Sequence, residues 1–324
     1  MFTFGSARAD TYSWTNFQSD IAGVAQHIDS NLVNSWGMAV PGPNGPIWVS
    51  DNGTGVSTLY NLDGTARPLI VTVPGRDRHH SGNPTGVVFN STAFFRVTEN
   101  GNSQPARFIF VNEDGTISGW NSALGGGTNA IVAVNAKGPA VYKGATLGVA
   151  NNHNFLFVTN FHEGKVETYD ENFNKVNPNG FVDPNIPHDF APFGIRNFNG
   201  QIYVTYAKQA PGKRDDEPGP GNGFISVFDT SGNFVMRLVS HGNLNSPWGL
   251  ALVEGNLWVG NFGDGKINNY DLAGNFIETL MRADGTPLQF DGLWDLLPGA
   301  NGVFFTAGIA DEGHGLFGLI TEDP

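Results

Sequence analysis

Short apolar runs separated by Gly, Asn and Asp recur along the whole chain, and residues 247–271 show the pattern most clearly. There, apolar runs at 250–253, 257–260 and 267–270 alternate with turn-forming residues at 254–256 and 262–265. Runs of this length with such turns predict antiparallel β-hairpins. Three strands cannot bury both of their faces alone, so the unit predicts neighbours of the same kind.

Six degraded copies of this unit can be recognised from the aromatic residue in the second apolar run of each copy. These aromatics are Trp48, Phe110, Phe157, Tyr203, Trp258 and Phe304. A period of about 50 residues is typical of a four-stranded propeller blade with long loops. We therefore predict an all-β fold, a six-bladed β-propeller. A β-sandwich lacks this periodicity and a β-helix has a shorter repeat, so both fit less well.

The sixth copy ends near Ile320, one strand short of a blade. Residues 12–17 alternate in the way that a strand requires, and we expect this N-terminal strand to pair into the last blade and close the ring. The predicted organisation is one propeller domain over residues 12–324. It follows a segment, residues 1–11, that is either flexible or the remnant of a signal peptide. Ala7-Arg8-Ala9 matches the small-residue cleavage pattern, although trimming or a chance match would look the same.

Composition narrows the function. The 44 Gly and 19 Pro suit many turns, and 25 Phe supply a large aromatic core. A net charge of -13 with only 17 Lys plus Arg disfavours nucleic acid as a partner. The absence of Cys excludes thiolate nucleophiles and Cys-ligated zinc. No apolar run approaches the roughly 18 residues of a membrane span. Separately, we expect the protein to be a monomer.

Several motifs together resemble a family of exported six-bladed β-propellers, many of whose bacterial members carry a C-terminal PEP-CTERM sorting tail. The resemblance covers residues 12–320 and rests on segments such as 32–37, 50–55, 114–120, 140–144, 203–208, 219–224, 259–265 and 313–318. It implies the propeller fold and a secreted or extracytoplasmic location. It implies no activity, and residues 321–324 do not match the sorting tail.

Histidines concentrate on one predicted face of the ring, where propellers usually bind ligands. His162 and His314 fall in loops between second and third strands. His27, His79, His80, His188 and His241 fall in connections between blades, and only His153 falls on the opposite face. Imidazoles bind metals and transfer protons near neutral pH, so convergence of three or more would make a site. The alternative is that His is simply common in long loops.

Acids and amides follow the second strands on the same face, at Asp51, Asn52, Glu113, Asp114, Asn160, Asn261, Asp264 and Glu312. Oxygen ligands from several blades could hold Ca²⁺ or Mg²⁺, as in lactonase-type propellers. Tight turns also demand Asn-Gly and Asp-Gly, and the turn role is the better interpretation for Asn52, Asp114 and Asp264. Asn160 and Asn261 precede an aromatic residue instead, and we expect them to point inward.

Two further groups have structural interpretations. Trp36, Trp248 and Trp294 begin innermost strands and could line a sugar site, but packing between blades is the preferred role. The charged segments 76–80 and 213–217 are interpreted as solvated loop tips. No nucleophile elbow, phosphate loop or helical metal motif is present.

The sequence thus predicts a metal-assisted hydrolase, lyase or oxidoreductase that acts on a small polar substrate, with a divalent metal ion of unknown identity as cofactor. The predicted metal ligands are His162, His188, His241 and His314. The predicted catalytic groups are His162, His314 and Glu312, and the predicted ligand-binding residues are Asp51, Asn160, Tyr206, Asn261 and Asp264. A module that binds carbohydrate or another small molecule without catalysis, and a protein-interaction platform, are the alternatives.

Overall fold

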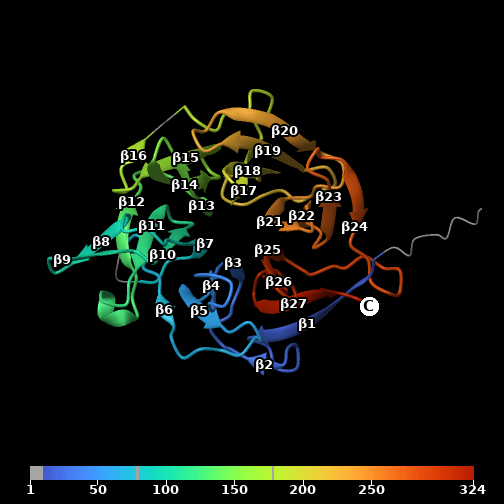
Figure 1. Cartoon of the computed structure of the whole chain (residues 1–324), viewed down its shortest axis with the longest axis horizontal. Coiled ribbons are helices and arrows are strands. Elements are labelled where there is room, and N and C mark those ends of the chain that lie inside the picture. Colours follow the sequence, from blue (N-terminus) through green and yellow to red (C-terminus); the bar gives the residue numbers. More distant parts are fainter. Residues whose placement is uncertain (1–9, 78–79, 177–178) are drawn as a thin grey trace, which may run out of the picture.

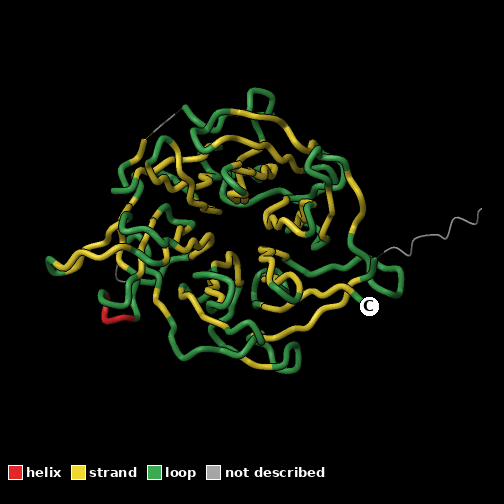
Figure 2. The backbone as a smooth tube through the Cα atoms, viewed as in Figure 1, coloured by secondary structure: helices red, strands yellow, loops and turns green. Residues whose placement is uncertain are grey.

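Six blades, each with four antiparallel strands, radiate around a central axis in the computed structural model, which describes residues 10–77, 80–176 and 179–324 (Figure 1). The last blade has a short fifth strand that pairs parallel at its edge. The predicted six-bladed propeller is confirmed. The one helical segment in the described residues is a short 3₁₀ turn, Gly125–Gly127, drawn red in Figure 2. No helix among them has the length and apolar character needed to cross a membrane. Most of the predicted N-terminal segment, residues 1–9, lies outside the described residues, as does His79.

Blades 1 to 3 follow one another along the chain, each running from its innermost strand to its outermost. Blade 1 contains β3 (Ser35–Ala39), β4 (Ile47–Asp51), β5 (Val56–Tyr60) and β6 (Val71–Thr72). Blade 2 contains β7 (Pro84–Phe89), β10 (Phe108–Asn112), β11 (Thr116–Trp120) and β12 (Ile131–Asn135), with an inserted hairpin of β8 (Arg96–Glu99) and β9 (Asn102–Pro105). Blade 3 contains β13 (Tyr142–Ala150), β14 (His153–Asn160), β15 (Lys165–Asp170) and β16 (Lys175–Val176).

Blades 4 to 6 complete the ring. Blade 4 contains β17 (Phe190–Phe198), β18 (Gln201–Lys208), β19 (Gly223–Asp229) and β20 (Phe234–Ser240). Blade 5 contains β21 (Pro247–Val253), β22 (Asn256–Asn261), β23 (Ile267–Tyr270) and β24 (Phe276–Thr279). Blade 6 contains β25 (Leu293–Gly299), β26 (Gly302–Ala307), β27 (Leu316–Glu322) and the N-terminal strand β1 (Tyr12–Ser19), with β2 (His27–Ile28) at its edge.

The ring is closed by the N-terminal strand, as predicted. β1 pairs antiparallel with β27 over its whole length, from Tyr12 opposite Glu322 to Ser19 opposite Leu316. In Figure 1 the blue β1 lies beside the red β27. The first and last parts of the chain therefore share one sheet, which leaves no open seam in the ring.

Glycines let the innermost strands approach one another at the centre. A Cβ on Gly37 would lie 2.7 Å from the carbonyl oxygen of Thr85, and one on Gly86 would lie 2.7 Å from the amide nitrogen of Ala145. Both distances are too short for any larger residue to fit without a shift of the backbone. The channel between the strands is consequently almost filled, with a residual cavity of about 20 Å³, room for about one water molecule.

Blade 6 carries Asp295 where the other five blades carry glycine. The buried Asp295 carboxylate accepts a hydrogen bond from the backbone N–H of Met38 in blade 1, at 2.8 Å, and forms an ion pair with Arg196 of blade 4. Burial raises the pKa of Asp295, and Arg196 opposes that rise. This carboxylate therefore ties three blades together at the axis.

Candidate functional site

The six innermost strands present one equivalent residue each at one end of the central channel. These residues are Trp36, Thr85, Lys143, Phe193, Trp248 and Trp294. In every blade the pairing of the first and second strands is irregular at this position, which is the mark of a β-bulge. Bulges redirect side chains, and here four of the six converge in one buried cluster. We call this end of the channel the channel mouth.

One part of the channel mouth, the aromatic half, consists of Trp36, Phe161, Phe193, Trp248, Phe262 and Trp294. The rings of Trp36 and Trp294 stack with their centroids 3.4 Å apart, and Phe262 stacks on Trp294 at 4.1 Å. Trp248 meets both tryptophans edge to face, at 6.0 and 5.9 Å. The tryptophans are thus core residues that pack between blades, as preferred from the sequence, and they meet one another at the axis.

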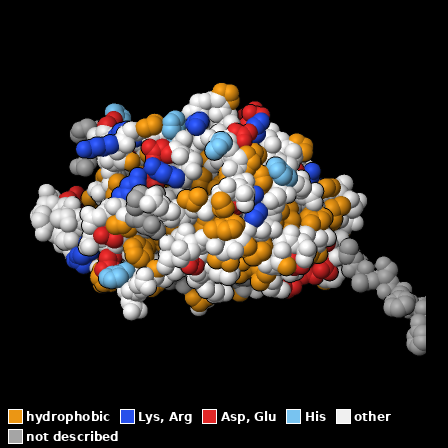
Figure 3. All heavy atoms as spheres, turned by 90° about the horizontal axis from the view of Figure 1, so that it is seen from above, with side chains coloured by type: hydrophobic (Ala, Val, Ile, Leu, Met, Phe, Trp, Pro, Cys, Tyr) orange, Lys and Arg blue, Asp and Glu red, His pale blue; other side chains and the backbone are white. Residues whose placement is uncertain are grey.

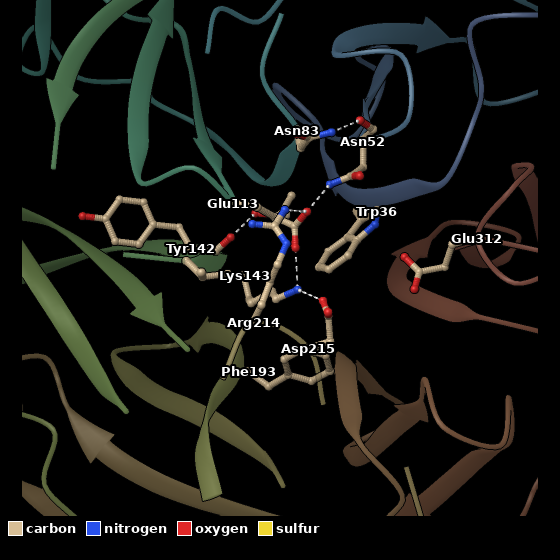
Figure 4. A network of polar contacts seen from close by, with 12 residues as sticks. Trp36, Asn52, Asn83, Glu113, Tyr142, Lys143, Phe193, Arg214, Asp215 and Glu312 are labelled. Atoms are coloured by element: carbon tan, nitrogen blue, oxygen red, sulfur yellow. Dashed lines mark hydrogen bonds and ion pairs between the residues drawn. The ribbon is translucent and has the colours of Figure 1, made fainter. Parts of the chain in front are cut away.

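The other part, the polar half, consists of Asn34, Asn52, Glu113, Lys143, Arg214 and Glu312 (Figure 4). Lys143 occupies the position that is aromatic in four other blades, and its side chain is only 3% exposed. Its Nζ lies 2.6 Å from Oε1 of Glu113, 3.7 Å from Asp215 and 4.9 Å from the centre of the Trp36 ring. The buried ammonium therefore has both carboxylate and cation–π partners.

Glu113 is the acid that neutralises this cation. Its Oε2 accepts hydrogen bonds from Arg214 at 3.0 Å and from the Asn52 amide at 3.4 Å. Burial disfavours the charged form of Glu113, but Lys143 and Arg214 outweigh burial and lower its pKa. Glu113 is consequently a permanent anion near neutral pH, with a structural role in holding Lys143.

Asn34 connects the polar half to the aromatic half. Its Oδ1 accepts hydrogen bonds from the indole N–H groups of Trp36 and Trp294, both at 3.0 Å. Its Nδ2 donates to Oε2 of Glu312 at 2.7 Å and to Oδ1 of Asn52 at 3.4 Å. Asn34 therefore links the Glu312 carboxyl to the stacked tryptophans through hydrogen bonds.

Glu312 differs electrostatically from Glu113. Burial raises its pKa, the Asn34 hydrogen bond and Lys143 oppose the rise, and the negative charges of Glu113 and Asp216 add to it. Figure 4 shows the Glu312 carboxyl pointing toward the Lys143 network from the other side of Trp36. The site thus contains a carboxyl that can hold a proton close to a fixed cation, a combination found in acid–base catalysis.

The loop that carries Glu312 has a strained backbone. Ala310, Asp311 and Glu312 have φ values of 55°, 52° and 61°, so three consecutive non-glycine residues occupy the left-handed region. Hydrogen bonds restrain the loop: Ala310 N–H donates to Asp291 at 2.8 Å, and His314 Nδ1 lies 2.6 Å from the Asp20 carboxylate. Strain of this kind persists where surrounding contacts impose it, commonly at functional sites.

The four histidines predicted as metal ligands lie in four different environments. His314 pairs with Asp20, His241 hydrogen-bonds the Gly221 carbonyl at 2.8 Å, and His188 is exposed. His162 lies in the turn after β14. In Figure 3 the pale-blue histidines lie at separate places on the visible face. No group of three or more His, Asp or Glu side chains that could hold a metal ion occurs within the described residues.

Of the predicted acids and amides, Asn52, Glu113 and Glu312 belong to the polar half. Asp51 is buried between strands, where burial raises its pKa well above the usual range and its Oδ2 accepts the Thr58 N–H. Asn160 bonds Glu163 and Glu167 inside blade 3, and Asn261 bonds Asn243 and Asp264 inside blade 5. Tyr206 lies in the core between blades 3 and 4, where burial raises its pKa.

Two interpretations from the sequence are correct but incomplete. Asn52 lies in a turn, as expected, but its amide also bonds Glu113 at the channel mouth. Residues 213–217 are largely exposed, as expected, but Arg214 also reaches Glu113, and burial raises the pKa of Asp216, close to Lys143. The long insertion between β18 and β19 folds back over the axis, and this long-range contact leaves no local signal in the sequence.

Lys143 could have been found from the sequence. Alignment of the copies by innermost strand places Lys143 level with Trp36, Phe193, Trp248 and Trp294. A charged residue at a position that is otherwise aromatic breaks the local rule, and such departures are expected at functional sites.

Comparison with known proteins decides the family. The chain is 32% identical over 336 residues to Uncharacterized protein R648 of Acanthamoeba polyphaga mimivirus, covering 99% of the chain and 83% of R648. It belongs to the family of R648. A second mimivirus member, Uncharacterized protein L690, is 31% identical over 321 residues, covering 93% of the chain and 83% of L690. No family model matches the sequence.

Solved structures similar to this member of the R648 family share only its fold. Virginiamycin B lyase from Staphylococcus aureus superposes with a TM-score of 0.53 at 14% identity, covering 96% of this chain and 99% of the lyase. A gluconolactonase from Xanthomonas campestris superposes with a TM-score of 0.54 at 12% identity, covering 89% and 87%. Both of these neighbours are enzymes by name, and their likeness to this chain is one of fold.

Proposed function

We propose that the chain is an enzyme, a hydrolase or lyase, that binds a small polar substrate over the channel mouth and transfers a proton through Glu312. The observation that supports this proposal is that Glu312, whose pKa is raised, lies on the other side of Trp36 from the buried cation Lys143 (Figure 4). A general acid or base works best when its pKa approaches the operating pH, and burial moves Glu312 in that direction.

Arg214 would contact the substrate. Its side chain is 52% exposed, while Lys143 beneath it is almost fully buried. A guanidinium held by Glu113 and open to solvent can bind a carboxylate, phosphate or developing oxyanion of the substrate. Lys143 would then act as a positioning residue, because it reaches solvent only through the groups that cover it.

The test is a panel of lactones, aryl esters and aryl glycosides assayed with the purified protein and the Glu312→Gln variant. We expect turnover of at least one class, with kcat about 10²-fold lower in the variant because a general acid or base contributes about that factor. Arg214→Met should raise KM. The control is Glu163→Gln, an exposed glutamate in the corresponding loop of blade 3, which should behave like the parent.

Activity that survives unchanged in Glu312→Gln would overturn the assignment of this residue. Absence of turnover on the whole panel, with a ligand that binds the parent but not Arg214→Met, would favour the non-enzymatic binding module instead. If the proposal holds, the pH profile of turnover in the parent should show one group, Glu312, titrating above the ordinary glutamate pKa of about 4.3.

Two predictions from the sequence stay part of the proposal: export from the cytoplasm and a bound divalent metal ion. The described residues offer no set of three ligands, so the chemistry proposed here routes no step through a metal. Elemental analysis of the purified protein tests the metal, with His162→Ala and His314→Ala as variants that should lose it. Fractionation of cells that express the natural gene tests the location.

A further inference from the structure

A cavity of about 610 Å³ lies between blades 5 and 6, beside the channel mouth. Its walls come from the loop after β22, the long connection from β24 to β25, and the ring-closing strand β1. The lining side chains that could contact a ligand through an aromatic ring or a polar group are Trp14, Phe262, Asp264, Arg282, Gln289 and Asp291. A volume of this size is typical of small-molecule sites.

Two half-buried aromatic rings face this cavity. Phe262 is held by its stack on Trp294, and Trp14 is held edge to face by Phe290 at 5.6 Å and by the Arg282 guanidinium at 5.3 Å from its ring centre. Both rings are therefore fixed in place before any ligand arrives. Preorganised rings lose little entropy when they bind.

Hydrogen bonds also hold two polar side chains of the cavity, and each of them keeps one oxygen that can accept a further hydrogen bond. One carboxylate oxygen of Asp291 accepts the Ala310 N–H at 2.8 Å, and Gln289 Nε2 donates to the Asp264 carbonyl at 2.8 Å. Among the described residues, no protein group bonds the second carboxylate oxygen of Asp291 or the amide oxygen of Gln289. These oxygens can accept hydrogen bonds from ligand hydroxyl groups.

The carboxylates around the cavity slightly outnumber the cations. Those of Asp264 and Asp291 lie near Arg282 and near Lys266, whose Nζ is 3.4 Å from Asp264, but the Arg282 guanidinium also forms an ion pair with Asp284, at 3.3 Å. Three carboxylates against two cations do not favour an anionic ligand. The aromatic rings and free acceptors favour a neutral, polyhydroxylated ring, whose apolar face can pack on an aromatic side chain.

We propose that this cavity binds a neutral saccharide through Trp14, Phe262, Gln289 and Asp291. The proposal does not depend on the reaction proposed for the channel mouth. Binding here would place a sugar ring against Phe262, which is stacked on the central Trp294, and against Asp291, which holds the loop that carries Glu312.

The experiment measures binding of methyl glucoside, methyl galactoside, methyl mannoside, maltose and cellobiose to the whole chain by saturation-transfer NMR. We expect at least one sugar to bind with a Kd of about 1 mM. Trp14→Ala should weaken it by about tenfold, and Gln289→Ala, which removes no packed ring, by about fivefold. The control Phe94→Ala removes an exposed aromatic from blade 2 and should change nothing.

Each variant is first shown to be folded by its cooperative thermal unfolding. No detectable binding of any of the five sugars to the parent would overturn the proposal. Binding that is unaffected by both Trp14→Ala and Gln289→Ala would also overturn it, because the sugar would then occupy another place on the molecule.

Discussion

Blades 4, 5 and 6 present Phe193, Trp248 and Trp294 at the channel mouth, whereas blades 2 and 3 present Thr85 and Lys143 at the same structural position. The backbone is the same on both sides, with a bulge in every blade. Only the side chains differ. The aromatic half closes the channel by stacking, and the polar half closes it with ion pairs.

This difference shows how a repeat protein acquires a site. The repeat fixes where six side chains meet, and the chemistry then depends on which blades depart from the aromatic pattern. Lys143 is the largest departure, and its partners come from other blades, since Glu113 belongs to blade 2 and Asp215 to the insertion of blade 4. A buried lysine is costly unless it is fully paired, so this departure is expected to serve function rather than stability.

Of the substitutions predicted here to change stability, Trp294→Ala in the aromatic half should lower the free energy of unfolding the most. Trp294→Ala removes a fully buried ring that stacks on Trp36 and Phe262, and we expect the free energy of unfolding to fall by about 4 kcal/mol. The loss should be the same at pH 5 and pH 7, because no titrating group loses its charge partner. Urea unfolding at both pH values measures it. A loss that depends strongly on pH would show that Trp294 is coupled to a titrating group, such as Glu312 through Asn34.

Lys143→Met should destabilise the polar half by about 3 kcal/mol at pH 7, because it leaves Glu113 as a buried anion with only Arg214 beside it. Without Lys143, burial raises the pKa of Glu113 in the variant. Protonation as the pH falls toward about 5 then relieves part of the loss, so the difference from the parent should shrink. Lys165→Met, which removes an exposed lysine paired with Glu163, should cost less than about 0.5 kcal/mol at both pH values.

Glu312→Gln tests whether the two glutamates of the polar half differ in pKa, as their surroundings predict. Since burial raises the pKa of Glu312, its ionisation costs folding free energy above the unfolded-state pKa of about 4.3. Glutamine does not ionise, so relative to the parent the variant should gain up to about 1 kcal/mol as the pH rises from about 4 to about 7. A difference that stays constant across this range would show that the Glu312 pKa is not raised.

The smallest expected change in the free energy of unfolding comes from a substitution in the strained loop at residues 310–312. Asp311→Gly places a residue that tolerates φ near 52° at an exposed position, and we expect a gain of about 0.5 kcal/mol in the free energy of unfolding. If the strain serves to position Glu312, the same variant should lose activity while it gains stability. Loss of stability would show that the aspartate side chain has contacts that offset the strain.

Much of the fold could be predicted because its signals are local. The turns at 254–256 and 262–265, the aromatic of each second strand and the alternation of residues 12–17 each lie within a few residues of one another. Glu312 was found for the same reason, since it follows a second strand directly. The predicted histidines share one predicted face of the ring, but loops of one face can end far apart on a ring of this size, and no described contact brings two of them together.

The sequence by itself determined the number of blades, their order and the closure by the N-terminal strand, because strand length and turn chemistry are properties of short segments. Only the tertiary structure decided which side chains meet at the axis. Asn34, Glu113, Lys143, Arg214 and Glu312 come from five separate parts of the chain, and their contacts depend on the bulges, on the glycine-lined approach of the inner strands and on an insertion that folds back. Charges buried by such contacts acquire their pKa values from neighbours that no local pattern identifies.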